Sequence, residues 1–130
     1  MPQRMKNLLK NKILIIAIFV TVCILYLSLI KMPEYNVAIR HLDKLQHCFA
    51  YLVLTFFWLF AFYKKEKKHL IIFCCILFGI LIEVLQYTIT NYRTGDYLDV
   101  VANSSGVLFG FFIFNQVFKK NRLKNKKTCN

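Results

Sequence analysis

The chain contains four long apolar segments separated by short polar stretches. The apolar segments run from Ile13 to Ile30, from about Leu45 to Tyr63, from about His69 to Thr90 and from Tyr97 to Phe118. Each has roughly the 20 residues that a helix needs to cross a hydrocarbon core about 30 Å thick. Lipid cannot hydrogen-bond to the backbone, so each crossing must be a helix or part of a closed barrel, and the alternation of period two that barrel strands require is absent. The pattern predicts an all-α fold, a four-transmembrane-helix bundle.

Composition agrees with a protein of the membrane. Of the 130 residues, 58% are hydrophobic, and the mean hydropathy is +0.48. A soluble domain of this length is normally less apolar. The five cysteines include no CxxC pair and suggest no disulfide scaffold. We expect no cofactor.

The first apolar segment has an alternative interpretation as a signal peptide, because basic residues precede it. Its apolar run from Ile13 to Ile30 is longer than a usual signal core, and the residues from Ser28 to Pro33 show no small-x-small cleavage pattern. We interpret it as a helix that the mature protein retains.

The positive charge of the chain is concentrated in three places. The net charge is +12, which in a soluble protein would suggest nucleic-acid binding. Here most basic residues lie before the first segment, between the second and third segments, and after the fourth. The positive-inside rule then places both termini in the cytoplasm and the first and third loops outside. We expect a basic cytoplasmic N-terminus at 1–12, a transmembrane domain at 13–118, and a basic cytoplasmic tail at 119–130 that is disordered.

The second apolar segment begins with a group of polar residues. Asp43, Lys44, His47 and Tyr51 follow one another at spacings of three or four residues, which puts them on one side of a helix. Helix capping is an alternative role for Asp43, since Asp43 with Gln46 resembles a capping box. Capping does not explain His47, one turn further in, although a single histidine there is more often structural than a ligand.

The third segment and the loop after it carry three more candidates. Glu83 lies inside the apolar run, and Gln86 follows it on the same helix face. A charged residue within a membrane segment costs about 3 kcal/mol on insertion scales, so it normally has a partner or a function. Arg93 lies in the loop, and its planar guanidinium suits a phosphate or a carboxylate. Its alternative role is an ion pair with Asp96 or Glu83.

One face of the fourth segment is acidic at its start and carries small residues further along. Asp96, Asp99, Asn103, Gly106 and Gly110 recur every three or four residues. Asp96 is a plausible N-cap. The Gly106-xxx-Gly110 spacing is typical of two membrane helices in close contact.

All of these polar residues lie toward the outer ends of the predicted helices, whereas the cytoplasmic halves carry almost none. We therefore predict that two helical hairpins bring them together in one pocket near the outer leaflet, formed by the second, third and fourth helices. The candidates for general acid and base are His47, Glu83 and Asp99. The candidate binding residues are Asp43, Lys44, Tyr51, Gln86, Arg93, Asp96 and Asn103. Histidine, glutamate and aspartate can also hold a divalent metal, but no motif with ligand spacing demands one.

The ordered set of polar positions from about residue 40 to 118 resembles the VanZ-like family of small bacterial membrane proteins. The resemblance implies a multi-pass protein of the bacterial cell envelope, in the cytoplasmic (inner) membrane, whose founding relative is tied to low-level resistance to the lipid-bearing glycopeptide teicoplanin. It implies no settled reaction. Family members often have a proline shortly before the arginine, where this chain has Asn91 and Tyr92.

Two classes of function remain open from the sequence. In the first, the protein binds or acts on an envelope lipid or lipid-linked glycan, with Lys44 and Arg93 holding an anionic headgroup and His47 acting with Glu83 or Asp99 in proton transfer. In the second, the protein is a non-catalytic membrane module in which the buried polar residues hold the helices together. The expected partners are membrane lipids, and nucleic acid is not expected.

Overall fold

The computed structural model describes residues 2–30, 40–63, 66–91 and 96–128. These residues form four helices and no strand: α1 (Gln3–Leu29), α2 (Arg40–Ala61), α3 (Lys68–Ile89) and α4 (Tyr97–Thr128). All four are long and apolar enough to cross a membrane. The predicted all-α bundle of four membrane-spanning helices is therefore confirmed.

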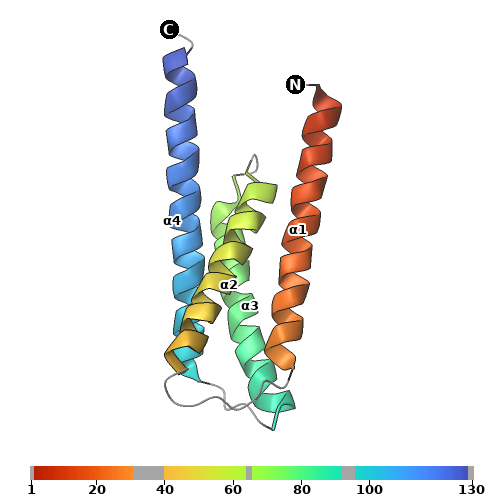
Figure 1. Ribbon diagram of the computed structural model, residues 1–130, viewed down its shortest axis with the longest axis vertical. Helices are drawn as coiled ribbons and strands as arrows, with labels where there is room; N and C mark the ends of the chain where they lie inside the picture. Colours follow the sequence, from red (N-terminus) through yellow and green to blue (C-terminus); the bar gives the residue numbers. More distant parts are fainter. Residues whose placement is uncertain (1, 31–39, 64–65, 92–95, 129–130) are drawn as a thin grey trace.

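The helices run up and down beside one another, with α1 and α4 on the flanks and α2 and α3 between them (Figure 1). The start of α1 and the end of α4 lie at one end of the bundle, which we call the terminal end. The start of α2, the end of α3 and the start of α4 lie at the opposite end, which we call the loop end. Most of the polar candidates from the sequence lie on helix turns near the loop end.

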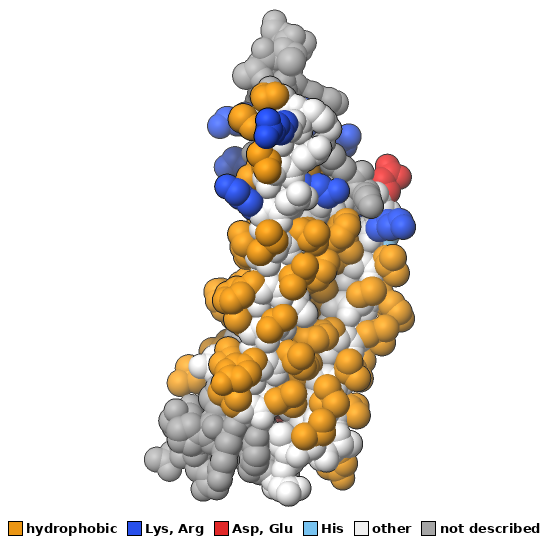
Figure 2. Space-filling model, turned by 90° about the vertical axis from the view of Figure 1, so that its right-hand side faces the viewer, with side chains coloured by type: hydrophobic (Ala, Val, Ile, Leu, Met, Phe, Trp, Pro, Cys, Tyr) orange, Lys and Arg blue, Asp and Glu red, His pale blue; other side chains and the backbone are white. Residues whose placement is uncertain are grey.

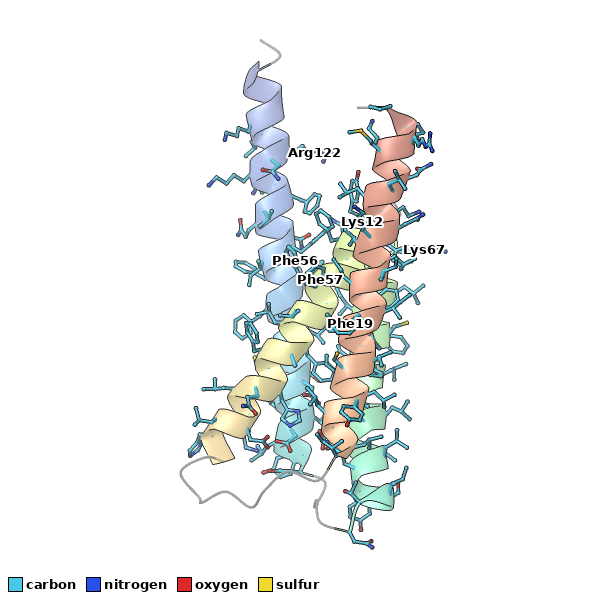
Figure 3. The ribbon with its side chains drawn as sticks, turned by 45° about the vertical axis from the view of Figure 1, so that its right-hand side comes forward. Lys12, Phe19, Phe56, Phe57, Lys67 and Arg122 are labelled. Atoms are coloured by element: carbon cyan, nitrogen blue, oxygen red, sulfur yellow. The ribbon has the colours of Figure 1, made fainter. Side chains whose placement is uncertain are left out.

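The surface has the character expected of a membrane protein. Large apolar side chains are exposed along the helices, among them Phe19 at 67%, Phe49 at 67% and Phe112 at 59%. On the face in Figure 2, hydrophobic side chains cover the middle of the molecule and Lys and Arg gather toward the terminal end. Such a wide apolar surface would promote aggregation in water and is suited to lipid. Lys12 on α1, Lys67 just before α3 and Arg122 on α4 lie toward that same end (Figure 3).

Glycines allow α2 and α4 to pack closely, and this pair forms the largest interface in the bundle. A Cβ atom at Gly106 would lie 2.1 Å from the Cys48 carbonyl oxygen, and one at Gly110 would lie 2.7 Å from the Leu52 carbonyl oxygen. Both neighbours are backbone atoms of α2, which cannot move aside without moving the helix. The small residues of the fourth segment therefore pack helix against helix, as their spacing indicates.

The α1 helix is held to the rest of the bundle near its middle and at its end. The indole Nε1 of Trp58 donates a hydrogen bond of 3.1 Å to Thr21 Oγ1. At the loop end, Gln86 Nε2 donates a hydrogen bond of 2.8 Å to the Ser28 carbonyl oxygen. That carbonyl lies in the last turn of α1, where carbonyl groups have no partner within their own helix.

The structure differs from the sequence predictions at two helix boundaries. Residues 119–128, expected to be a disordered tail, continue α4 as helix to Thr128. Lys, Arg and Leu are good helix formers, so a helix already established by packing can continue through them into the tail. In addition, α2 includes Arg40, so Asp43 lies inside the first turn and is not an N-cap. An acidic side chain in a first turn still interacts favourably with the helix dipole.

Candidate functional site

Five charged or titratable side chains meet at the loop end and form what we call the polar cluster: Asp43, Lys44 and His47 on α2, with Asp96 and Asp99 at the start of α4. Lys44 joins the two helices, since its Nζ donates to Asp96 Oδ2 at 2.9 Å and to Asp99 Oδ1 at 3.1 Å. The side chains of Lys44 and Asp99 are 23% and 14% exposed. The cluster is thus partly shielded from solvent.

The start of α4 fixes the two acidic residues of that helix. Asp96 immediately precedes α4, and its Oδ1 accepts a hydrogen bond of 3.0 Å from the Leu98 backbone N–H. Its carbonyl oxygen accepts another, of 2.9 Å, from the Asp99 N–H. These are the bonds of an N-cap, which satisfies an amide that has no partner inside the helix. Asp96 therefore caps α4 and binds Lys44 at the same time.

A second group within the polar cluster consists of Asp43, His47 and Asp99. His47 Nε2 lies 3.7 Å from Asp43 Oδ1, one helical turn away. One ligand atom from each of these three residues lies within 4.8 Å of the other two. The sequence places Asp43 and His47 on one helix face, but only the fold brings Asp99 to them.

A pocket of about 260 Å³ opens beside this group, between α1 and α2, and we call it the α1–α2 pocket. Asp43 and His47 reach it from the polar cluster, and Tyr51 lines it one turn further along α2. The wall on the α1 side consists of Ile24, Leu27 and Ser28. Polar groups thus lie on the α2 side of the pocket, and an apolar surface lies on the α1 side.

Deeper in the bundle, polar side chains from three helices form a buried layer that consists of Tyr51, Glu83 and Asn103. They are 1%, 6% and 1% exposed. A Cβ atom on Gly79 would lie 3.2 Å from Tyr51 Cε1 and 3.2 Å from Asn103 Cβ, so α2, α3 and α4 converge at this glycine. Within the described part of the chain, the Tyr51 hydroxyl and the Asn103 amide have no hydrogen-bond partner.

The chain was compared with protein families, with curated proteins and with solved structures. A family model described as VanZ/LLP1 matches residues 13–119. The chain belongs to the VanZ/LLP1 family. An uncharacterized protein of the fission yeast Schizosaccharomyces pombe is 31% identical over 126 residues, which are 95% of this chain and 75% of the yeast protein. No solved structure matches the chain.

Membership of the VanZ/LLP1 family confirms the resemblance seen in the sequence, but the family is not confined to bacteria. The matched region of residues 13–119 contains all four apolar segments and both groups of polar residues. The yeast relative shows that a similar chain exists in a eukaryote. The bacterial origin expected from the resemblance is therefore not established.

The structure brings some of the predicted residues together and separates others. Asp43, Lys44, His47, Asp96 and Asp99 form the polar cluster, and Tyr51 links the α1–α2 pocket to the buried layer. Gln86 does not line this pocket but bonds to the end of α1. Glu83 and Asn103 also lie outside its wall, in the buried layer. Arg93 lies outside the described residues.

The sequence did not indicate that α1 contributes to a pocket. We expected a pocket among the second, third and fourth helices, whereas the one beside the polar cluster lies between α1 and α2. The α1 helix carries only weakly polar residues, which predicts a simple anchor. A carbonyl in the last turn of a membrane helix needs a donor from elsewhere, and Gln86 Nε2 donates to that of Ser28. Any residue at this position would supply the same backbone carbonyl, so the sequence carries no signal for this contact.

Proposed function

We propose that this VanZ/LLP1 protein binds and acts on the headgroup of an envelope lipid or a lipid-linked glycan at the loop end of the bundle. The observation that supports this most is that the polar cluster and the α1–α2 pocket meet at Asp43 and His47. A cavity between membrane helices, with a few converging polar groups at one side, is a typical place for a ligand. A lipid can present its headgroup to the cluster while its tail stays in the bilayer.

The residues take distinct roles in this proposal. Lys44, held in place by Asp96 and Asp99, binds an anionic group of the ligand together with Arg93, which precedes α4 in the sequence. His47 is the candidate for proton transfer in any reaction, because imidazole is the side chain that most often serves as a general acid or base. Asp99 lies close enough to orient it. Glu83 is too deeply buried to be a first choice for the same role.

The location follows from the charge pattern. We propose a multi-pass protein with the terminal end in the cytoplasm and the loop end at the outer surface, in the inner membrane if the host is a bacterium. The yeast relative favours a ligand that bacterial and fungal membranes share, such as a lipid headgroup or a lipid-linked sugar. Resistance to glycopeptides such as teicoplanin would then be a consequence of altered envelope lipids in a bacterial host.

The alternative is a non-catalytic membrane module. Two observations favour it: Lys44 bonds with two carboxylates, and Gln86 bonds with the end of α1. Both contacts join helices and are the kind of polar contact that stabilises a membrane bundle. In this case the polar residues would affect stability and not ligand binding.

Two conservative substitutions separate these functions. Purified protein in lipid nanodiscs is incubated with a polyprenyl-phosphate-linked sugar, and both the bound fraction and any cleaved product are measured. We expect His47→Gln to lower binding or turnover about tenfold or more, with unchanged accumulation and thermal unfolding. Thr88→Ala serves as a control, because Thr88 is exposed and its hydroxyl bonds only to its own helix. Unchanged binding in His47→Gln would support the structural module. So would a His47→Gln protein that loses binding only because it no longer folds.

A further inference from the structure

We propose that Asp43, His47 and Asp99 form a binding site for one divalent transition-metal ion at the junction of α2 and α4. One potential ligand atom of each residue lies within 4.8 Å of the others. The residues come from two helices, and His47 with its side chain 11% exposed stands at the edge of the α1–α2 pocket. Two carboxylates and one imidazole form a ligand set that suits Mn²⁺ and Zn²⁺.

The distances allow such an ion after a small adjustment of side chains. Metal bonds of about 2.0–2.2 Å place neighbouring ligand atoms roughly 3–3.5 Å apart. His47 Nε2 and Asp43 Oδ1 are already 3.7 Å apart. Rotation of the two aspartate side chains would move their oxygens by up to about 1 Å, which is enough to close the remaining gaps between the ligand atoms. The backbone of neither helix needs to move.

The charge of the two carboxylates in this group suits a cation. One ligand atom of Asp43 on α2 and one of Asp99 on α4 lie within 4.8 Å of each other. Two carboxylates this close attract a divalent ion more strongly than either does alone. A bound ion could also join an anionic headgroup to the protein beside Lys44, a role that rests on the proposed function, whereas the metal site itself does not.

Lys44 and the metal ion can bind the Asp99 carboxylate at the same time. A carboxylate has two oxygens and can accept about four bonds, so Asp99 can bind Lys44 through Oδ1 and a metal through its remaining capacity.

The α1–α2 pocket gives the ion access to a ligand. Asp43 and His47 line it, and so does Tyr51, which is 1% exposed and whose hydroxyl lacks a hydrogen-bond partner among the described residues. A buried hydroxyl without a partner costs free energy unless a molecule in the pocket bonds to it. A water or a headgroup oxygen in the pocket would meet this need.

The test is a Mn²⁺ titration of the full-length protein in nanodiscs of phosphatidylcholine, after removal of metals with a chelator. Electron paramagnetic resonance measures free and bound Mn²⁺, and its nitrogen couplings report a bound imidazole. We expect one Mn²⁺ per chain with a nitrogen coupling. His47→Gln should remove the coupling, and Asp43→Asn and Asp99→Asn should each weaken binding about 10- to 100-fold.

Asp96→Asn is the matched control. It removes the same unit of charge from the same cluster, and asparagine caps a helix as well as aspartate does. We expect it to change Mn²⁺ affinity much less than Asp99→Asn. Equal effects of the two substitutions, a missing nitrogen coupling or no saturable binding would each overturn the metal site. Headgroup binding that persists in the presence of the chelator would show that the proposed function does not need the metal. Mn²⁺ binding by a protein that binds no headgroup would support the metal site and contradict the proposed function.

Discussion

Asn103 is a polar residue at a position that normally suits an apolar one. It is 1% exposed, and its amide has no hydrogen-bond partner among the described residues. Burial of an amide without a partner costs roughly 1–3 kcal/mol, and folded proteins usually avoid it. A residue that breaks a local rule in this way is expected at a functional site. Its neighbours, Tyr51 and Gly79, place it at the meeting point of three helices.

Replacement of Asn103 by leucine should therefore not destabilise the bundle. We expect Asn103→Leu to leave the free energy of unfolding unchanged or to raise it by about 1 kcal/mol, because the change removes an unsatisfied amide and leucine has the same branching and the same number of side-chain heavy atoms. Unfolding in mixed detergent and lipid micelles measures this. A loss above about 1 kcal/mol would contradict this expectation.

Lys44 has opposite effects on the stability of the protein and on the affinity of the metal site. Lys44→Met leaves Asp96 and Asp99 without their shared cation, and we expect a loss of about 1 kcal/mol in the free energy of unfolding, since these side chains are partly exposed. The same change removes a positive charge next to the proposed ion, so Mn²⁺ should bind about fivefold more tightly. Weaker Mn²⁺ binding in this variant would contradict the model of the cluster.

Much of the candidate site could be predicted at this scale, but its pairings could not. Spacing along one helix showed that Asp43 and His47 share a face. It could not show that Lys44 reaches Asp99 on another helix, because the rotation of α4 depends on packing at glycines far from the acidic residues. The partner of Gln86 could not be predicted for the same reason, since Ser28 contributes a backbone atom that carries no sequence signal.

At the scale of elements, the closest approach of α2 and α4 should make Gly106 the least replaceable of three glycines. A Cβ at this position meets a backbone oxygen at 2.1 Å, whereas one at Gly79 meets side-chain atoms at 3.2 Å. We expect Gly106→Ala to cost about 3 kcal/mol or more, Gly110→Ala less, and Gly79→Ala under about 1 kcal/mol. Unfolding measurements on the three variants give the order. A different order would mean that α2 and α4 pack otherwise.

The attachment of α1 depends on few polar contacts. Gln86→Leu removes the bond to the Ser28 carbonyl oxygen, and we expect it to lower the free energy of unfolding by about 1–2 kcal/mol. Increased proteolysis or cysteine labelling along α1, for example at Cys23, would report its looser docking. Gln86→Glu is unsuitable as a control because it adds a buried charge, so the exposed Thr88→Ala is used again. An unchanged α1 would show that apolar contacts alone hold it.

Helix identity was predictable because lipid imposes length and composition on each span. Each of the four predicted segments corresponds to one helix and extends at most two residues past its end. The ends of the helices were less predictable. Nothing in the apolar pattern marks where a helix stops once it has left the membrane, and the basic tail therefore looked disordered although residues 119–128 are helical.

The whole molecule has one basic end and one end where acidic residues gather. Lys12, Lys67 and Arg122 lie toward the terminal end, while Asp43, Asp96 and Asp99 lie at the loop end. An asymmetry of this kind sets the direction of membrane insertion. We therefore predict that the proposed site faces away from the cytoplasm.

We expect a reporter fused to the C-terminus to be active in the cytoplasm and one inserted after Asn91 to be active outside. Alkaline phosphatase and green fluorescent protein fusions measure this, because the first is active only outside and the second fluoresces only inside. Opposite activities would place the polar cluster on the cytoplasmic side. The fold and the metal site would be unaffected, but a ligand in the outer leaflet would be excluded.

The tight contact between α2 and α4 has a consequence for biosynthesis. Of the four spans, α2 has the lowest mean hydropathy and begins with the charged residues of the cluster. It leaves the ribosome second, whereas its main packing partner α4 leaves last. Between these two moments α2 is a weakly inserting segment that can dock on α1 but lacks its largest packing surface. Integration of the nascent chain is therefore expected to finish only after release, and a chain truncated before α4 should be removed by membrane quality control.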